Sequence, residues 1–219
     1  MEERKHIVIL AAGDFPTHPI PLHTLREADY VVCCDSAYND WKKASEKWQV
    51  KIPFTVIGDG DSISPSDKNT LGNNWIEVAE QDYNDLHKAV HWVMKEIGAG
   101  AEISILGATG KREDHTIGNI SYLATFGDEY PGIPIEILTD HGRFTLAKGA
   151  GTFCSFPGQQ VSLISLTPHI PVSATGLRWP LDNRHLSIWW QGTLNEALSY
   201  IFTVEGGSVL VFQTYEPKE

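Results

Sequence analysis

The chain has 219 residues, of which 42% are hydrophobic and 21% charged, a composition typical of a globular protein and unlike that of disordered or collagen-like chains. Its length suits one large domain or two smaller ones, and we favour two. The formal net charge of −11 leaves no basic surface that would attract a nucleic-acid backbone, so neither DNA nor RNA is an expected partner. This charge does not exclude ATP, because metal ions and helix N-termini can neutralise phosphates locally.

The segment Met1–Lys5 leads into an apolar run that is too short for a signal peptide, and no apolar stretch has the length needed to span a bilayer. Cys33 and Cys34 are neighbours in an expected strand, so their side chains should face opposite sides of the sheet, and Cys154 is left over. We therefore expect a reduced cytoplasmic protein without a membrane partner.

Residues 1–132 alternate apolar strands with helical patterns. Strands are expected at His6–Ala12, Tyr30–Cys34, Phe54–Ile57 and Ile103–Leu106. The clearest helix ends before Gly98, and its apolar stripe consists of Leu86, Ala89, Val90, Val93, Met94 and Ile97. This alternation predicts an α/β domain with a parallel sheet flanked by helices.

Residues 133–219 follow a different pattern. Short alternating runs such as Val161–Leu166 and Ser208–Phe212 are separated by Gly, Pro and Asn, and no amphipathic helix is evident. This pattern predicts an antiparallel β domain, and Tyr130–Pro134 is the expected linker.

Polar residues follow three of the expected strands. Asp35 comes directly after the second, Gly58–Ser62 after the third, and Gly107–Gly110 after the fourth. In an open parallel sheet the carboxyl ends of the strands form the ligand-binding edge, so these segments should converge on one crevice.

Asp59 and Asp61 offer two hard oxygen ligands on a flexible turn, which suits magnesium better than zinc. A solvated turn without metal is the simplest alternative, because Asp and Gly are common turn residues. A haloacid-dehalogenase-like phosphatase with Asp59 as nucleophile is another. An EF-hand is excluded, because Ile63 occupies the next ligand position.

Two further clusters could contact phosphates. In Gln81–Asp85, Asp82 and Asp85 fit a helix N-terminus, which would explain them by capping alone, yet Asp85 and Lys88 also share one helix face. Gly107–His115 is not a Walker A loop, because its glycines are too close and no Ser or Thr follows its lysine. A simple turn explains its glycines but not its Arg-x-Asp-His sequence, which favours a phosphate-binding role for Arg112.

Other features carry less weight. His87 and His91 have a spacing that could bind a metal, but they lie off the apolar stripe without a zinc-type partner, and we expect them to be solvated. Trp179, Trp189 and Trp190 are expected to be mostly packed, although one could stack on an aromatic ligand.

Taken in order from Asp35 to about Phe212, these motifs resemble those of the thiamine pyrophosphokinases. The matching segments are Gly58–Ser62, Gly107–Gly110 with Arg112, Asp114–His115 and Asn119–Ile120, then Gly176–Leu181 and Gly192–Glu196. The resemblance implies a Rossmann-like nucleotide-binding domain (1–132) followed by a β-sandwich (133–219) in a homodimer. It also implies magnesium-dependent transfer of a diphosphoryl group from ATP to the hydroxyl of thiamine, with each active site between subunits.

The resemblance also assigns residues. Asp59, Asp61 and Asp85 would hold magnesium and, with Arg112, form the catalytic set. The ATP side would comprise Asp35, Asn39, Gln81, Asp82, Lys88, Thr109, Arg112, Asp114 and His115. The thiamine side would comprise Trp179, Thr193 and Asn195, with Trp179 stacking on thiamine from the partner subunit.

The chain departs from the family pattern at several positions. Gly60 replaces an aromatic residue, Ser36 a glycine, Asn84 a threonine and Lys111 a glycine. Leu194 replaces a serine whose hydroxyl could bind the aminopyrimidine. A diphosphokinase acting on another heterocyclic alcohol, such as a hydroxymethyl-pterin, is therefore an alternative, and a non-catalytic thiamine- or nucleotide-binding module is a second.

Overall fold

The computed structural model describes residues 4–61, 63–80 and 82–217, and the chain divides into two compact units. The first unit comprises the described residues of Met1–Tyr122 together with Gly132–Asp140. The second comprises Leu123–Pro131 and the described residues of His141–Glu219. The division expected between residues 132 and 133 thus precedes a segment that clusters with the first unit.

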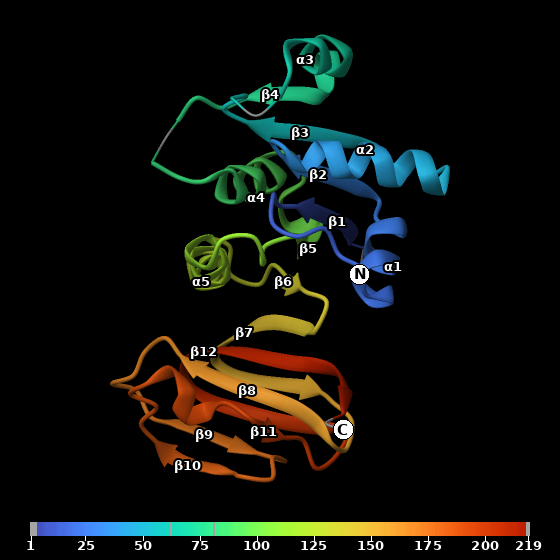
Figure 1. Ribbon diagram of the computed structural model, residues 1–219. Coiled ribbons are helices and arrows are strands. Elements are labelled where there is room, and N and C mark those ends of the chain that lie inside the picture. Colours follow the sequence, from blue (N-terminus) through green and yellow to red (C-terminus); the bar gives the residue numbers. More distant parts are fainter. Residues whose placement is uncertain (1–3, 62, 81, 218–219) are drawn as a thin grey trace. The chain divides into compact units, whose positions relative to one another are not determined.

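A parallel sheet forms the centre of the first unit (Figure 1). Its strands are β1 (Lys5–Leu10), β2 (Tyr30–Cys34), β3 (Phe54–Gly58), β4 (Trp75–Glu77), β5 (Ala101–Leu106) and β6 (Ile135–Leu138). They lie in the order β6-β5-β1-β2-β3-β4, and every pairing is parallel. The four strands expected from the sequence are confirmed. The antiparallel pairing expected for residues 133–219 is wrong for β6, which pairs in parallel with β5.

Five α-helices accompany these strands in the part of the chain that the structure describes. They are α1 (Pro19–Arg26), α2 (Ala37–Trp48), α3 (Pro65–Leu71), α4 (Asp85–Glu96) and α5 (Glu113–Glu129), with 3-10 turns at η1 (Gly72–Asn74) and η2 (Gly98–Gly100). Helix α4 begins where the Asn84 side chain accepts a hydrogen bond from the His87 amide at 3.0 Å, and Gly98 follows its end with a φ of 66°. None of the described helices has the length and apolar character of a membrane span.

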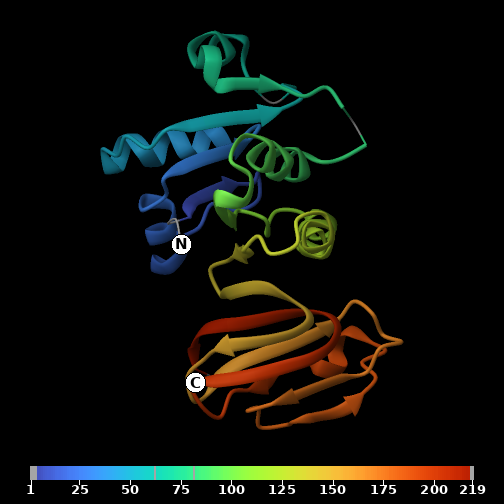
Figure 2. The ribbon, with the colours of Figure 1, turned by 180° about the vertical axis from the view of Figure 1, so that it is seen from behind.

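Alternating residues of the parallel strands pack on opposite faces of the sheet. Val8 and Cys33 join one core cluster with Trp41 of α2. On the other face, Cys34 contacts the Asp85 carbonyl of α4. Figures 1 and 2 show α2 and α4 on different sides of these strands. Cys33 and Cys34 thus point to opposite faces of the sheet, as expected, and both are buried. Burial raises the pKa of each thiol, which keeps both protonated.

The second unit is built from antiparallel strands. They are β7 (Gly142–Cys154), β8 (Gln159–Ser165), β9 (Val172–Thr175), β10 (Leu181–Arg184), β11 (Asn195–Glu196) and β12 (Ile201–Pro217), with a 3-10 turn at η3 (Trp189–Gly192). Strand β12 pairs with β7, β8 and β9. Burial alternates along β8, so that Val161 and Leu163 face a core shared with Val209 and Val211. Both runs expected as strands here are confirmed.

Candidate active site

A pocket with a volume of about 390 Å³ lies at the carboxyl ends of the parallel strands in the first unit. Strand order reverses between β1 and β5: the chain runs outward from β1 to β4 and then returns beside β1. Loops on either side of such a reversal diverge and leave a crevice for a ligand. The described lining residues come from these loops and the two helices that follow them: Ala11, Ala12, Gly13, Cys34, Asp35, Ser36, Asp59, Asp61, Asn84, Asp85, Leu86, Ala108, Gly110, Lys111, Arg112, His115 and Asn119.

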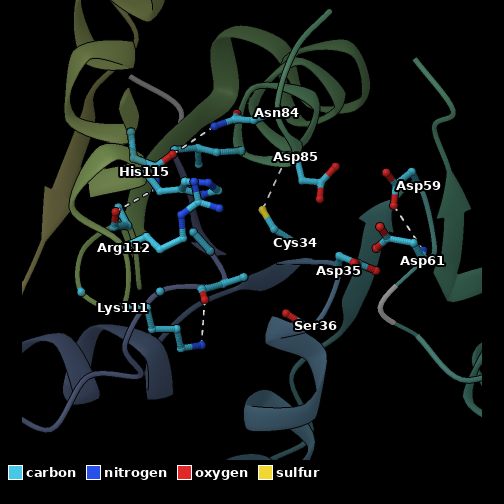
Figure 3. A pocket seen from close by; sticks show the side chains of 17 residues that line it. Cys34, Asp35, Ser36, Asp59, Asp61, Asn84, Asp85, Lys111, Arg112 and His115 are labelled. Atoms are coloured by element: carbon cyan, nitrogen blue, oxygen red, sulfur yellow. Dashed lines mark hydrogen bonds between the residues drawn. The ribbon is translucent and has the colours of Figure 1, made fainter. Parts of the chain in front are cut away.

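Three carboxylates gather on one side of this pocket. Asp35, Asp59 and Asp61 each place an oxygen within 4.8 Å of the others (Figure 3). Asp35 is buried and has a φ of 41°, a conformation that non-glycine residues seldom adopt. A Cβ added to Gly58 would lie 2.8 Å from the Cβ of Asp35, so glycine at 58 allows the second and third strand ends to approach closely. Three convergent carboxylates are a donor set that fits a hard divalent cation such as magnesium.

Asp85 lines the same pocket from the first turn of α4. Burial raises the pKa of Asp85, Lys88 opposes that rise, and the charges of Asp59 and Asp61 add to it. The Lys88 ammonium is buried and lies 3.3 Å from Asp85 Oδ1 and 3.2 Å from the Val78 carbonyl oxygen, to which it donates. Lys88 therefore contacts Asp85 from within the protein. It is not among the described residues that line the pocket.

Basic groups lie on the other side. Figure 3 shows Lys111, Arg112 and His115 across the pocket from Asp59 and Asp61. Arg112 donates to both oxygens of Asp114, at 3.1 Å from Nε and 2.6 Å from Nη2. That interaction lowers the pKa of Asp114, so the carboxylate stays charged and orients the guanidinium. A chain of phosphates would thus meet carboxylate-bound metal on one side and cations on the other.

The structure brings six of the predicted ATP-side and metal-site residues together in this pocket: Asp35, Asp59, Asp61, Asp85, Arg112 and His115. The described lining does not include Asn39, Asp82, Lys88, Thr109 or Asp114. Gln81, and Ser62 of the acidic motif, lie outside the described residues. Thr109, which is outside the described lining, has a backbone role: its carbonyl oxygen accepts from the Asp14 amide at 2.8 Å.

Sequence reasoning missed a second role of Asn84. Its Nδ2 donates to Asn119 Oδ1 at 3.0 Å, and Asn119 Nδ2 donates to the Ala108 carbonyl at 2.8 Å. Asn84 is also the N-cap of α4, because its side chain accepts from the His87 amide; Asp82 and Asp85, which their position at the helix start suggested as caps, do not have this role, and Asp85 lies in the first turn. Asn119 lies in the matching motif, but its link to Asn84 spans 35 residues and leaves no local signal.

The expectation that His87 is solvated is wrong. His87 is 7% exposed and stacks on Tyr83 at a centroid distance of 4.1 Å, with Tyr122 of α5 at 5.5 Å. Aromatic side chains from two other segments cover this face of α4, which the apolar stripe alone did not reveal. His91 is exposed, as expected.

The structure explains one departure from the family pattern. Gly60 has a φ of 79°, and a Cβ there would lie 2.2 Å from the Nζ of Lys68 and 2.9 Å from the ring of Trp75. Lys68 Nζ lies 5.2 Å from the centroid of that ring. A side chain at position 60 would be strained at this φ, would require Lys68 to move and would contact Trp75.

A second group of candidate residues lies in the second unit. Asn195 is buried, accepts from the Trp179 amide at 3.1 Å and donates to the Trp179 carbonyl at 2.7 Å. Thr193 donates to the Trp190 carbonyl at 2.8 Å. Asn195 and Thr193 thus hold the backbone of two tryptophans that are 58% and 69% exposed, so the expectation of packed tryptophans is wrong. Indole rings presented in this way can stack on a flat ligand.

Comparisons with known proteins match both parts of the chain to one family. Residues 22–137 match the family model "Thiamin pyrophosphokinase, catalytic domain", and residues 142–212 match "Thiamin pyrophosphokinase, substrate-binding domain". Thiamine pyrophosphokinase 1 of Oryza sativa subsp. japonica is 33% identical over 180 residues, which cover 71% of this chain and 67% of that protein. Thiamin pyrophosphokinase 1 of Caenorhabditis elegans is 27% identical over 197 residues, covering 85% and 79%.

The fold has solved relatives as well. Thiamin pyrophosphokinase from Candida albicans superposes with a TM-score of 0.82 at 18% identity, covering 97% of this chain and 90% of that one. This similarity supports an α/β fold with a mixed sheet. The two family matches account for most of the chain, so the protein belongs to the thiamine pyrophosphokinase family.

Proposed function

We propose that this chain transfers the diphosphoryl group of ATP to the hydroxyl of thiamine, giving thiamine diphosphate and AMP. The observation that carries this proposal is the pocket at the strand-order reversal, with convergent carboxylates facing Arg112 and Lys111. Family membership supplies the reaction, and the pocket supplies the groups that a diphosphoryl transfer needs. Such transfers depend mainly on positioning and on stabilisation of phosphate charge.

Asp59, Asp61 and Asp85 would hold magnesium, and the position of Asp35 makes it a further candidate ligand. When bound, the cation would neutralise charge on the phosphate oxygens. Arg112, oriented by Asp114, would steady the phosphate chain, and Lys88 would keep Asp85 ionised. Asn39, Gln81, Asp82, Thr109 and His115 complete the proposed ATP side.

In the proposed reaction the hydroxyl oxygen of thiamine attacks the β-phosphorus of ATP. The bond from the β-phosphorus to the oxygen shared with the α-phosphate breaks, and AMP leaves with the electron pair. Asp35 and Asp85 are the candidates to accept the hydroxyl proton, because both carboxylates line the pocket. Burial raises the pKa of Asp85, which makes its ionised form a stronger base.

Trp179 is the proposed stacking partner of thiamine, with Asn195 and Thr193 supporting the exposed tryptophans. We further propose a homodimer in which Trp179 of one subunit serves the pocket of the other. In this arrangement residues 1–132 act as a Rossmann-like ATP-binding domain and residues 133–219 as a thiamine-binding β-sandwich. The reduced cysteines fit a cytoplasmic location.

Product analysis tests the proposal. The protein is incubated with ATP and magnesium, with and without thiamine, and AMP, ADP, phosphate and thiamine diphosphate are quantified. Equal amounts of AMP and thiamine diphosphate, formed only with thiamine, are expected. Phosphate released without an acceptor would instead indicate a phosphatase, and ATP binding without AMP formation would indicate a binding module.

A variant pair identifies the metal site. Asp59→Ala should abolish turnover while ATP binding persists, whereas Asp182→Asn, an exposed aspartate in the second unit, should change neither. Full activity of Asp59→Ala would refute the assigned role.

Leu194 motivates a second candidate acceptor. It is 73% exposed and beside Asn195, so it presents an apolar group where a hydroxyl could bind an aminopyrimidine. Direct competition between thiamine and a hydroxymethyl-pterin in the same assay would decide between them.

A further inference from the structure

Lys111 adopts a backbone conformation that is unusual for a lysine. Its φ is 58°, in the left-handed region that glycine occupies readily and that costs other residues about 1 kcal/mol. Glycine would adopt this φ without strain. Strained residues of this kind concentrate at binding and catalytic sites. The strain at Lys111 therefore indicates that its side chain has a function at this pocket.

The Lys111 side chain joins two loops at the pocket. Its Nζ donates to the Ala12 carbonyl at 2.8 Å, reaching from the loop after β5 to the loop after β1. Backbone hydrogen bonds already connect these loops, from Gly13 to Gly107 at 2.7 Å and from Asp14 to Thr109 at 2.8 Å. The ammonium is thus held at the pocket wall, and two of its three N–H groups are left to donate elsewhere.

Lys111 also differs from the neighbouring cations in its ion pairing. Arg112 forms an ion pair with Asp114, and Lys88 forms one with Asp85. For Lys111, the described part of the chain shows a neutral carbonyl as partner and no carboxylate within ion-pair distance. Of the two described residues with a permanent positive charge that line the pocket, Arg112 forms an ion pair and Lys111 does not; the Asp14 carboxylate lies beside the adjacent Gly110.

We propose that Lys111 binds phosphate oxygens of the nucleoside triphosphate, as a specificity-determining residue that favours ATP over nucleosides without a phosphate chain. This inference rests on the proposed function, because it takes the pocket to be the ATP site. Figure 3 shows Lys111 on the side of the pocket away from Asp59 and Asp61. The carboxylates would hold the cation that neutralises phosphate charge, and the Lys111 ammonium on the other side of the pocket would be free to donate to phosphate oxygens.

The test measures binding of magnesium-ATP and of adenosine by calorimetry for wild type and three variants. Lys111→Met removes the ammonium but keeps an unbranched side chain at this left-handed position. Lys111→Gly removes the ammonium and relieves the strain, and Lys111→Arg keeps a positive charge. Lys51→Met is the matched control, because Lys51 is exposed and precedes β3 at the opposite edge of the sheet.

We expect Lys111→Met and Lys111→Gly each to weaken ATP binding by roughly fivefold, the size of a solvent-exposed charge interaction. Adenosine binding and the KM for thiamine should be unchanged, and Lys111→Arg should bind ATP within about twofold of wild type. The ATP affinity of Lys111→Met should also depend less on salt concentration than that of wild type.

Unchanged ATP affinity in Lys111→Gly would overturn the proposal, and so would equal weakening of ATP and adenosine, which indicates a purely structural link between the loops. If wild type binds ATP but forms no thiamine diphosphate, the proposed reaction fails while the binding ratios still decide the role of Lys111. If Lys111→Met does not fold, Lys111→Gly carries the test, because it relieves strain at this position.

Discussion

The acidic cluster should destabilise the protein when metal is absent, and Asp59→Asn measures by how much. The ligand oxygens of Asp35, Asp59 and Asp61 lie within 4.8 Å of one another. Two unit charges at that separation repel by about 3.5 kcal/mol at an effective dielectric of about 20 and by about 0.9 kcal/mol in bulk water. Asp61 is exposed and Asp35 buried, so the two pairs that Asp59 makes fall between these limits.

In the structure the Asp61 amide donates to Asp59 Oδ1 at 3.2 Å. Asparagine at position 59 removes the charge but keeps an oxygen that can accept this hydrogen bond. The pair with exposed Asp61 lies near the lower limit and the pair with buried Asp35 between the limits, so we expect Asp59→Asn to stabilise the metal-free protein by about 2 to 4 kcal/mol. For a chain of this size, that raises the unfolding midpoint by roughly 2 to 4 °C per kcal/mol.

The assay is thermal unfolding in EDTA and in excess magnesium. Wild type should gain about 2.7 kcal/mol of stability when magnesium is present at a hundred times its Kd, whereas Asp59→Asn should gain far less. Asp182→Asn, exposed and in the second unit, should behave as wild type in both buffers. A variant that is less stable than wild type in EDTA, or that responds to magnesium as wild type does, would refute the electrostatic reasoning.

Three further predictions concern single residues. Burial raises the pKa of Asp85 and Lys88 opposes that rise, so Lys88→Met should raise it further. The acid limb of the kcat/KM profile should then move to higher pH, because Asp85 must be ionised to bind metal; an unmoved limb would exclude Asp85 as the titrating group. Asn195→Ala removes two hydrogen bonds to the Trp179 backbone, so the unfolding free energy should fall by about 1 to 3 kcal/mol. The KM for thiamine should rise while the KM for ATP stays constant. Equal changes in both KM values would contradict a role confined to Trp179. Leu194 has a φ of 60°, so Leu194→Gly should stabilise the protein by about 1 kcal/mol in a denaturant titration, whereas a loss of stability would show that its side chain makes stabilising contacts.

The central strands and the acidic loop could be predicted because their signals are local. Apolar runs marked β1, β2, β3 and β5, and the polar residues that follow them face one pocket because parallel strands end at the same edge. Asp35 and Asp59 were located in this way. Strands β4 and β6 have three and four residues, too few for a pattern to distinguish them from a turn.

Contacts between distant segments could not be predicted. The burial of His87 depends on Tyr83 and Tyr122, and the Asn84–Asn119 hydrogen bond joins two helices across 35 residues. Asn195 was predicted to lie on the thiamine side, but its hydrogen bonds to the Trp179 backbone follow from a pairing that no local pattern records.

The Lys111 link has the same origin. Its hydrogen bond reaches Ala12 over 99 residues, and only the unexpected lysine at a glycine position gave a signal. Gly60 and Lys111 were informative because Gly60 lies in the acidic loop and Lys111 lines the pocket on the side away from that loop.

The most direct test of the central claim is to follow ATP labelled at the β-phosphorus through one reaction with thiamine and magnesium. Attack of the thiamine hydroxyl on the β-phosphorus predicts that the label appears in thiamine diphosphate and that AMP is unlabelled. Label recovered in ADP would mean that the γ-phosphoryl group alone is transferred, and this result would contradict the account.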